Sequence, residues 1–379
     1  MQFKIAKDSL SKWSNGVTNL EETLKDANYP KIRMFTIAHK VADQPLGDVN
    51  GSWMVCTPEQ IGSFSAVAFF FGKEISKFGN VAVGLINSSW GGTPAESWTR
   101  KEVMEKDPEL QPILKRYQHT VDNYTQLMKE RKDKKEIIGP ESNKSPYKLY
   151  NGMINPLLNY HIRGVIWYQG ESNAERAYQY RKLFPAMVSG WRKDWKLGDF
   201  PFYFVQISPH KSQNPVIRES QFISMDKIRN SGMVVTTDNG DANNIHPRNK
   251  EIVGKRLSYW ALKRDYGQKH ISASGPLYES MKIVGNQIKI SFRPGTDKLT
   301  SPKGELKEFL IAGADQVFHK AKAKVADNTI LVWNDEIPHP VAVRFGWSNV
   351  PDLNLFNTDG LPASPFRTDH YPVATEGLN

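Results

Sequence analysis

The sequence has very little cysteine: Cys56 is the only one in 379 residues. A single cysteine excludes an internal disulfide framework and a zinc site built from several cysteines. Long apolar runs are also missing, and none approaches the roughly 20 residues that a membrane-spanning helix needs, so we expect no membrane partner. Residues 1–7 show no positive region followed by an apolar stretch, which argues against a secretory signal there.

Charge is present but not concentrated. Lys and Arg number 50 against 40 Asp and Glu, a formal net charge of +10. The densest run, residues 129–136 (KERKDKKE), is mixed in sign and indicates the solvated end of a helix. Since the remaining positive charge is scattered, we expect no nucleic-acid partner. Apolar residues at 39% suit a chain that buries a core.

Strand-like apolar runs alternate with helical patterns up to about residue 265. The expected strands are 32–37, 80–86, 163–168, 202–207 and 233–237. The expected helices are 63–78, 173–195, 215–229 and a last one from near His246-Pro247 to about Arg264. This alternation predicts an α/β domain over residues 1–267 with a doubly wound parallel sheet. Functional residues then belong on loops at the carboxyl ends of the strands.

Three regions depart from this alternation. No strand precedes the polar loop up to about Tyr29, although an α/β sheet normally opens with one. Residues 100–150 are long, charged and helical, and they predict an inserted helical hairpin or lid. From residue 268 to 379, short alternating runs separated by turn residues predict a small all-β module.

The loop after the strand at 80–86 has the sequence NSSWGGTP (residues 87–94). The paired Gly91 and Gly92 let the backbone approach a ligand closely, and their N–H groups could stabilise an oxyanion. A tight turn between a strand and a helix would explain the same two glycines equally well.

The loop after the strand at 163–168 gathers Gln169, Glu171 and Asn173 in the sequence QGESNA. Asn173 could donate a hydrogen bond to an oxyanion or simply cap the next helix, and Glu171 could orient a histidine. The segment also has the form Gly-x-Ser-x-Ala between a strand and a helix, which mimics a nucleophile elbow with Ser172 at its tip.

The loop after the strand at 233–237 ends in His246, near the end of the α/β domain. A histidine there suits a general base, although a lone histidine more often caps a helix or bonds within a core. Because all three loops are expected at one edge of the sheet, we favour catalysis.

These loops lie in longer segments that together resemble the sialate O-acetylesterase family of SGNH-type carbohydrate esterases. The matching segments, in chain order, are GLINSSWGGTPAESW (84–98), LYNGMINPLL (149–158), GVIWYQGESNAERA (164–177), NIHPRNKEIVGKRL (244–257) and GLPASPFRTD (360–369). The resemblance implies an SGNH-hydrolase-like fold and a carboxylic ester hydrolase that removes acetyl groups from sialic acid or another acetylated glycan. It implies no metal and no organic cofactor. Relatives are commonly exported, so we expect the full-length protein to be periplasmic or secreted.

In this family a first strand leads into Gly-Gln-Ser-Asn-Met, whose serine is the nucleophile. Met1-Gln2-Phe3 resembles the residues that begin at that methionine, and Gly-Gln-Ser-Asn occurs nowhere in the sequence. We therefore expect the serine, its strand and the preceding β-rich segment to be absent from this chain. A gene start taken at an internal methionine would explain this, and we favour it over a genuine fragment.

The acid partner of the histidine also departs from the family pattern. Many members carry Asp two residues before it, where this chain has Asn244. An amide can hold an imidazole but cannot neutralise an imidazolium, which leaves Asp241 and Glu171. Because the Glu of the same Gln-Gly-Glu motif resembles the acid in related esterases, we expect Glu171 to be the closer to the His246 ring, within hydrogen-bond reach or one water.

The implied mechanism is two-step acyl transfer. His246 would deprotonate the serine, and the oxyanion would be held by the serine N–H, by Gly91 or Gly92 and by Asn173. Gln169 and Asn151 are further candidates for contacts with the oxyanion or substrate. Two other interpretations stay open: a sugar-binding pseudoenzyme without the nucleophile, and an α/β-hydrolase that uses Ser172. The sequence does not specify the sugar, the acetyl position or the oligomeric state.

Overall fold

The computed structural model describes residues 1–7, 15–130, 139–295, 298–302 and 304–378. The strands of its first part are β1 (Tyr29–Thr36), β2 (Trp53–Cys56), β3 (Val83–Asn87), β4 (Val165–Trp167), β5 (Phe202–Val205) and β6 (Ser231–Val234). Its helices are α1 (Leu20–Lys25), α2 (Pro58–Ile61), α3 (Ala66–Gly79), α4 (Lys101–Lys106), α5 (Gln111–Asp122), α6 (Tyr124–Glu130), α7 (Ala177–Trp195), α8 (Pro215–Lys227) and α9 (Lys250–Arg264). Short helical turns are η1 (Ala95–Trp98), η2 (Tyr150–Ile154), η3 (Asn155–Leu157) and η4 (Glu171–Arg176). Within these ranges no helix has the length and apolarity needed to cross a membrane.

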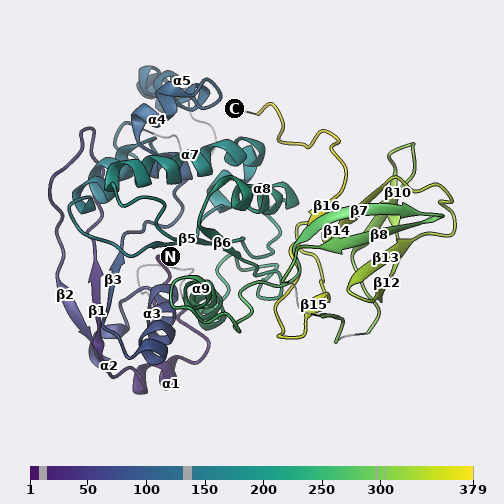
Figure 1. The fold of residues 1–379 in the computed structure, drawn as a ribbon. Coiled ribbons are helices and arrows are strands. Elements are labelled where there is room, and N and C mark those ends of the chain that lie inside the picture. Colours follow the sequence, from purple (N-terminus) through teal and green to yellow (C-terminus); the bar gives the residue numbers. More distant parts are fainter. Residues whose placement is uncertain (8–14, 131–138, 296–297, 303, 379) are drawn as a thin grey trace.

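The strands of this part form two separate three-stranded segments, in the orders β2-β1-β3 and β4-β5-β6. β1 pairs with β3 in parallel, and β5 pairs in parallel with both β4 and β6. Helices α7 and α8 lie on one side of the strands, and α3 and α9 on the other (Figure 1). An α/β architecture with parallel strands is thus confirmed. The sequence did not predict β2, which pairs antiparallel with β1 at the edge.

Two predicted boundaries near the end of this part were wrong. β6 ends at Val234, three residues before the expected end of its strand. Helix α9 begins at Lys250 rather than near His246-Pro247, because the Asn249 side chain accepts a hydrogen bond from the Ile252 N–H (3.3 Å) and caps the helix there. His246 therefore lies in the loop between β6 and α9.

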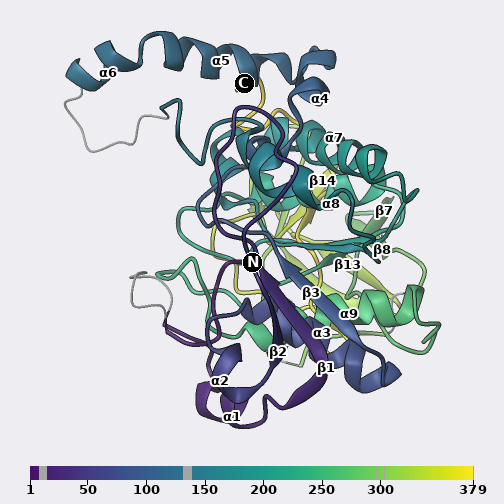
Figure 2. The same cartoon turned by 90° about the vertical axis from the view of Figure 1, so that its left-hand side faces the viewer.

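Residues 101–130, in the region expected to form an inserted helical hairpin or lid, are largely helical. Helices α4, α5 and α6 follow one another along the top of the molecule (Figure 2). Most of the charged run at 129–136 lies outside the described residues, since α6 ends at Glu130.

The described part of the chain after α9 contains strands and no helix, which confirms a C-terminal all-β region. Two four-stranded antiparallel sheets, β12-β13-β8-β7 and β11-β10-β14-β16, share a core of their own, and β9 pairs with β15. The strands are β7 (Tyr278–Val284), β8 (Gln287–Phe292), β9 (Leu299–Thr300), β10 (Phe309–Ala312), β11 (Phe318–Lys320), β12 (Lys322–Ala326), β13 (Thr329–Trp333), β14 (Ala342–Phe345), β15 (Phe356–Asn357) and β16 (Phe366–Arg367).

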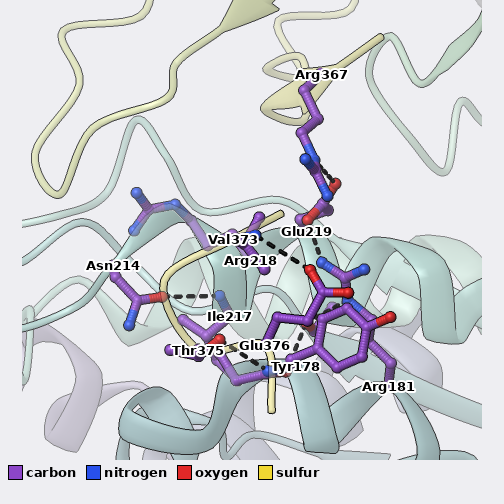
Figure 3. A network of polar contacts seen from close by, with 12 residues as sticks. Tyr178, Arg181, Asn214, Ile217, Arg218, Glu219, Arg367, Val373, Thr375 and Glu376 are labelled. Atoms are coloured by element: carbon purple, nitrogen blue, oxygen red, sulfur yellow. Dashed lines mark hydrogen bonds and ion pairs between the residues drawn. The ribbon is translucent and has the colours of Figure 1, made fainter. Parts of the chain in front are cut away.

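The C-terminal segment returns from these strands to α7 and α8 (Figure 3). Arg367 Nε donates to Glu219 Oε1 (2.6 Å), and the same carboxylate pairs with Arg181. The Tyr178 N–H donates to Thr375 Oγ1 (3.1 Å). These contacts attach the β region to the helices that cover β4, β5 and β6.

Candidate active site

A cavity of about 960 Å³ lies between β3 and β4. The loops that follow these two strands line it, together with the loop between β6 and α9. Of the residues expected in the site, the cavity lining contains Gly91, Gly92, Gln169, Glu171 and His246. Across the described ranges, no group of three or more His, Cys, Asp or Glu side chains could hold a metal ion.

His246 carries a half-buried imidazole with an unusually low pKa. Burial lowers the pKa of the ring to about 4, and the nearby charge of Lys250, the α-amino group of Met1 and His210 act in the same direction. The ring is therefore neutral at pH 7 and able to accept a proton. Asn244 shapes the loop through its Oδ1, which accepts the backbone N–H of His246 (2.9 Å).

Asp241 lies on the surface of the same loop. Its Oδ1 accepts the backbone N–H groups of Asn243 (2.8 Å) and Asn244 (3.2 Å), which forms a local turn. Among the described residues, no hydrogen bond or ion pair joins the His246 ring to Asp241 or to Glu171. The choice of Glu171 as acid partner therefore stays a prediction.

Lys250 is a charged residue of the cavity that the sequence analysis missed. Its Nζ lies over the rings of Phe3 (4.8 Å to the centroid) and Tyr168 (5.1 Å). Burial lowers the pKa of this ammonium group to about 8, and the charge of Glu171 opposes the shift. Burial raises the pKa of Glu171, against the pull of its basic neighbours. One signal was available: Lys250 stands four residues after His246, at a helix N-terminus where a positive charge is unfavourable.

The glycine loop after β3 offers a backbone donor to the cavity. The Gly91 N–H donates to Gln2 Oε1, an oxygen from outside its own loop. Gly92 has φ +74°, a conformation that favours glycine. The Gln2 amide also approaches His39 Nε2 (3.4 Å), whose ring stacks on Trp90 with centroids 4.0 Å apart. The sequence analysis did not single out His39.

Asn173 does not line the cavity, because other groups engage both atoms of its amide. Its Oδ1 accepts the Ala95 N–H (2.8 Å) and Gln169 Nε2 (2.6 Å). Its Nδ2 donates to Glu96 Oε2 (2.8 Å), a carboxylate that is buried. The amide thus joins the loops after β3 and β4, and an oxyanion role for Asn173 stays a prediction.

Two other residues considered from the sequence have different surroundings. Asn151 lies outside the cavity lining, and its Nδ2 donates to the carbonyl groups of Ala42 (3.2 Å) and Asp43 (2.8 Å). Ser172 does line the cavity, within the turn η4 rather than at a sharp elbow between strand and helix. Within the described part of the chain, no hydrogen bond joins its Oγ to a histidine.

A family model described as carbohydrate esterase, sialic acid-specific acetylesterase, matches residues 15–262. This range is more than half of the chain and contains all three loops of the cavity. The chain belongs to this carbohydrate esterase family. The family match ends before β7, so the C-terminal β region lies outside it.

Curated members of the esterase family match much of the chain. The sialate O-acetylesterase of Homo sapiens is 31% identical over 390 residues, which are 91% of this chain and 70% of the human protein. That of Rattus norvegicus is 31% identical over 310 residues, so the chain spans 57% of the length of the rat protein. The crystal structure of a carbohydrate acetylesterase from Xanthomonas citri is similar with a TM-score of 0.81 and 33% identity, over 94% of this chain and 77% of that one.

Proposed function

We propose that this chain forms the histidine-bearing part of an O-acetylesterase that acts on acetylated sugars, with O-acetylated sialic acid as the first candidate substrate. Its main support is that Gly91, Glu171 and His246 line one cavity in a chain of this family. The substrate class comes from two relatives, a sialate O-acetylesterase and a carbohydrate acetylesterase.

His246 is the proposed general base. Its imidazole is neutral at pH 7, since the pKa is about 4, and a neutral ring can take a proton from a hydroxyl group. The low pKa also makes the ring a weak base. The imidazolium formed during attack therefore needs a nearby anion, and Glu171 is the proposed anion because it lines the same cavity.

The proposed nucleophile is a serine in a Gly-Gln-Ser-Asn segment directly ahead of Met1, a motif that the 379 residues do not contain. The serine proton passes to His246 as Oγ bonds to the acetyl carbon, and the Gly91 N–H donates to the oxyanion. The bond to the sugar oxygen then breaks, and that oxygen takes the proton from His246. A water molecule, deprotonated by His246, attacks the acetyl-serine, which releases acetate and restores the serine.

A second candidate function is the binding of an acetylated sugar without hydrolysis. The lack of a Gly-Gln-Ser-Asn motif in the chain favours it. The two candidates share the cavity and differ only in whether a serine reaches it.

Acetate release from O-acetylated sialic acid and from 4-nitrophenyl acetate tests the proposal. The chain is compared with a version extended ahead of Met1 by an apolar strand and Gly-Gln-Ser-Asn, and with the same extension carrying Ala for Ser. We expect little turnover without the extension, at least about 10³-fold more with it, and loss of that gain with Ala. Robust turnover of the unextended chain that Ser172→Ala abolishes would favour the elbow interpretation. Sugar binding without hydrolysis by the extended chain would favour the pseudoenzyme.

A further inference from the structure

Another cavity, of about 360 Å³, lies at the opposite edge of the sheet from His246. The C-terminal half of α7, the loop from α7 to β5 and the loop from α8 to β6 line it. Because β5 and β6 are parallel and follow these two loops directly, the cavity lies at the amino ends of the strands. The candidate active site lies at the carboxyl ends, and the two cavities share no lining residue.

The lining of this cavity has an excess of positive charge. One of its residues is acidic, Asp199, and four are basic: Arg192, Lys193, Lys227 and Arg229. The remaining lining residues are uncharged. The formal excess is therefore three positive charges around a small volume.

Arg192 is the buried member of this group, with 9% of its side chain exposed. Its Nη2 donates to the carbonyl group of Phe200 (2.6 Å). Its Nε is also buried and, among the described residues, has no hydrogen-bond partner. Burial lowers the pKa of the guanidinium group, while Asp199 opposes this shift and Arg229 adds to it. Since buried charges are normally paired, this guanidinium group lacks a full anionic partner.

Asp199 does not satisfy the basic groups around it. Its Oδ1 lies 3.7 Å from Arg192 Nη1, and its Oδ2 lies 3.4 Å from Arg229 Nε. Both distances exceed the roughly 2.7–2.9 Å of a charge-assisted hydrogen bond. In the described part of the chain, the Lys193 ammonium group makes no hydrogen bond or ion pair. The cavity therefore offers N–H donors and positive charge that an anion could use.

Pro185 explains why Lys227 lies at this cavity. A proline inside a helix leaves the carbonyl group four residues earlier without its N–H partner, and here that carbonyl belongs to Arg181. The Lys227 Nζ donates to this carbonyl group (3.2 Å). An ammonium group has three donors, so this contact holds Lys227 in place and leaves donors for a ligand.

We propose that this cavity binds the phosphate group of a small organic molecule, such as a phosphorylated sugar. Its volume falls within the roughly 300–1,000 Å³ of small-molecule sites. A phosphate monoester carries roughly 1.5–2 negative charges at pH 7 and three strong acceptor oxygens, which suit the excess of positive charge better than a single carboxylate does. Arginine and lysine are the usual partners of such a group. The site lies away from His246 and does not depend on the proposed esterase chemistry.

Isothermal titration calorimetry of the 379-residue chain tests the site without any turnover. With glucose 6-phosphate as the probe, we expect saturable binding of one molecule per chain. Glucuronate, whose carboxylate carries a single charge, should bind at least about tenfold more weakly at the same low ionic strength. Absence of saturable binding of glucose 6-phosphate, or equal binding of glucuronate, would overturn the proposal.

Exposed residues of the lining allow variants that leave the core untouched. Ser189→Glu places a carboxylate in the cavity, and Lys193→Gln combined with Arg229→Gln removes two positive charges. Each should weaken the binding of glucose 6-phosphate at least about tenfold. Lys282→Gln combined with Lys320→Gln removes the same charge from exposed positions of β7 and β11 and should change the affinity less than about threefold. Equal losses in this control would show that net charge, and not the cavity, holds the ligand.

Two further measurements separate the source of the phosphate group and the place where it binds. Vesicles of phosphatidylcholine with phosphatidic acid present the same group on a lipid surface, and they should retain the chain no better than phosphatidylcholine alone. Retention without binding of glucose 6-phosphate would overturn the small molecule in favour of a lipid headgroup. In NMR spectra, glucose 6-phosphate should shift the amide signals of Gly198 and Ile228 and leave those of the His246 ring unchanged. The reverse pattern would place the ligand in the active-site cavity and refute the proposal.

Discussion

The two halves of the α/β sheet enclose their strands to different degrees. β5 is paired on both sides and buried at every position, whereas β3 and β4 each pair with one of the described strands and are mostly half-buried. Helix α3 packs against β1 and β3, while α9 packs against β5 and β6 and α8 packs against β6 from the other side of the sheet (Figure 1). We call β5 and β6 the closed half of the sheet, and β3 and β4 with the cavity between them the open half.

The groups suited to chemistry gather at the open half. Gly91 follows β3 and Glu171 follows β4, while His246 comes from the loop after β6 and still lines the same cavity. These three residues lie far apart in the sequence, and the fold brings them to the same cavity. The open half therefore holds the candidate site.

The largest expected effect is on turnover at the open half. In the chain extended by the strand and Gly-Gln-Ser-Asn, His246→Ala should lower kcat/KM about 10³- to 10⁴-fold, because the serine loses its proton acceptor. His270→Ala, an exposed histidine beyond α9, is the matched control and should change kcat/KM less than about threefold. A loss below tenfold for His246→Ala would exclude the open half as the site of the base.

The second largest effect is expected from removing the acid partner of His246. Glu171→Gln in the extended chain should lower kcat/KM by roughly 10²-fold, since the imidazolium would lose its proposed anionic partner. Asp241→Asn should have little effect because that carboxylate is exposed and bonded to backbone N–H groups of its own turn. The reverse pattern, with Asp241→Asn inactive and Glu171→Gln near normal, would reassign the acid and leave the esterase proposal intact.

A pair of identical substitutions compares the two halves directly in stability. Val205 in β5 is fully buried and Val83 in β3 is half-buried. Val205→Ala should lower the free energy of unfolding by about 2–3 kcal/mol, and Val83→Ala by about 1 kcal/mol or less. Urea denaturation measures both losses. Equal losses in the unextended chain would contradict the division into halves.

Much of the fold could be predicted from the sequence because its signals are local. Apolar runs such as residues 202–207 and the helical periodicity between them depend on near neighbours, and the strands and helices were found within a few residues. The short edge strand β2 (Trp53–Cys56) was missed because its residues do not belong to a longer apolar or alternating run. The split of the sheet could not be predicted, since pairing joins segments far apart in the chain.

The residues of the candidate site also fall into those that the sequence could predict and those that it could not. Residues that follow strands, such as Gly91 and Glu171, could be found because topology alone brings strand ends together. The sequence suggested that the Asn173 amide is free to bind an oxyanion. In the structure this amide makes hydrogen bonds with Ala95 and Glu96. Lys250 was missed because a lysine acquires significance only through burial, and burial is a property of the folded chain.

The smallest expected effect concerns the charge that Lys250 places beside His246. The ring pKa is about 4, lowered first by burial and next by this ammonium group. Lys250→Met removes the charge and keeps an apolar stem, so the ring pKa should rise while burial still holds it below 6.5. Lys211→Met, an exposed lysine bonded to Asn243, is the control and should leave the ring pKa unchanged.

The sign of the linked stability change follows from the same pKa. A ring whose pKa is about 4 when folded and 6.5 when unfolded binds more protons in the unfolded chain between these pH values, so it makes the protein less stable as pH falls from 6.5 to 4. Lys250→Met should raise the lower pH limit of this range. NMR titration of the His246 ring measures its pKa, and urea midpoints at pH 4.5 and 7 measure the change in stability. An unchanged or lower ring pKa would mean that the ammonium group of Lys250 does not act on the ring, and that burial with the charges of Met1 and His210 sets the pKa of this histidine.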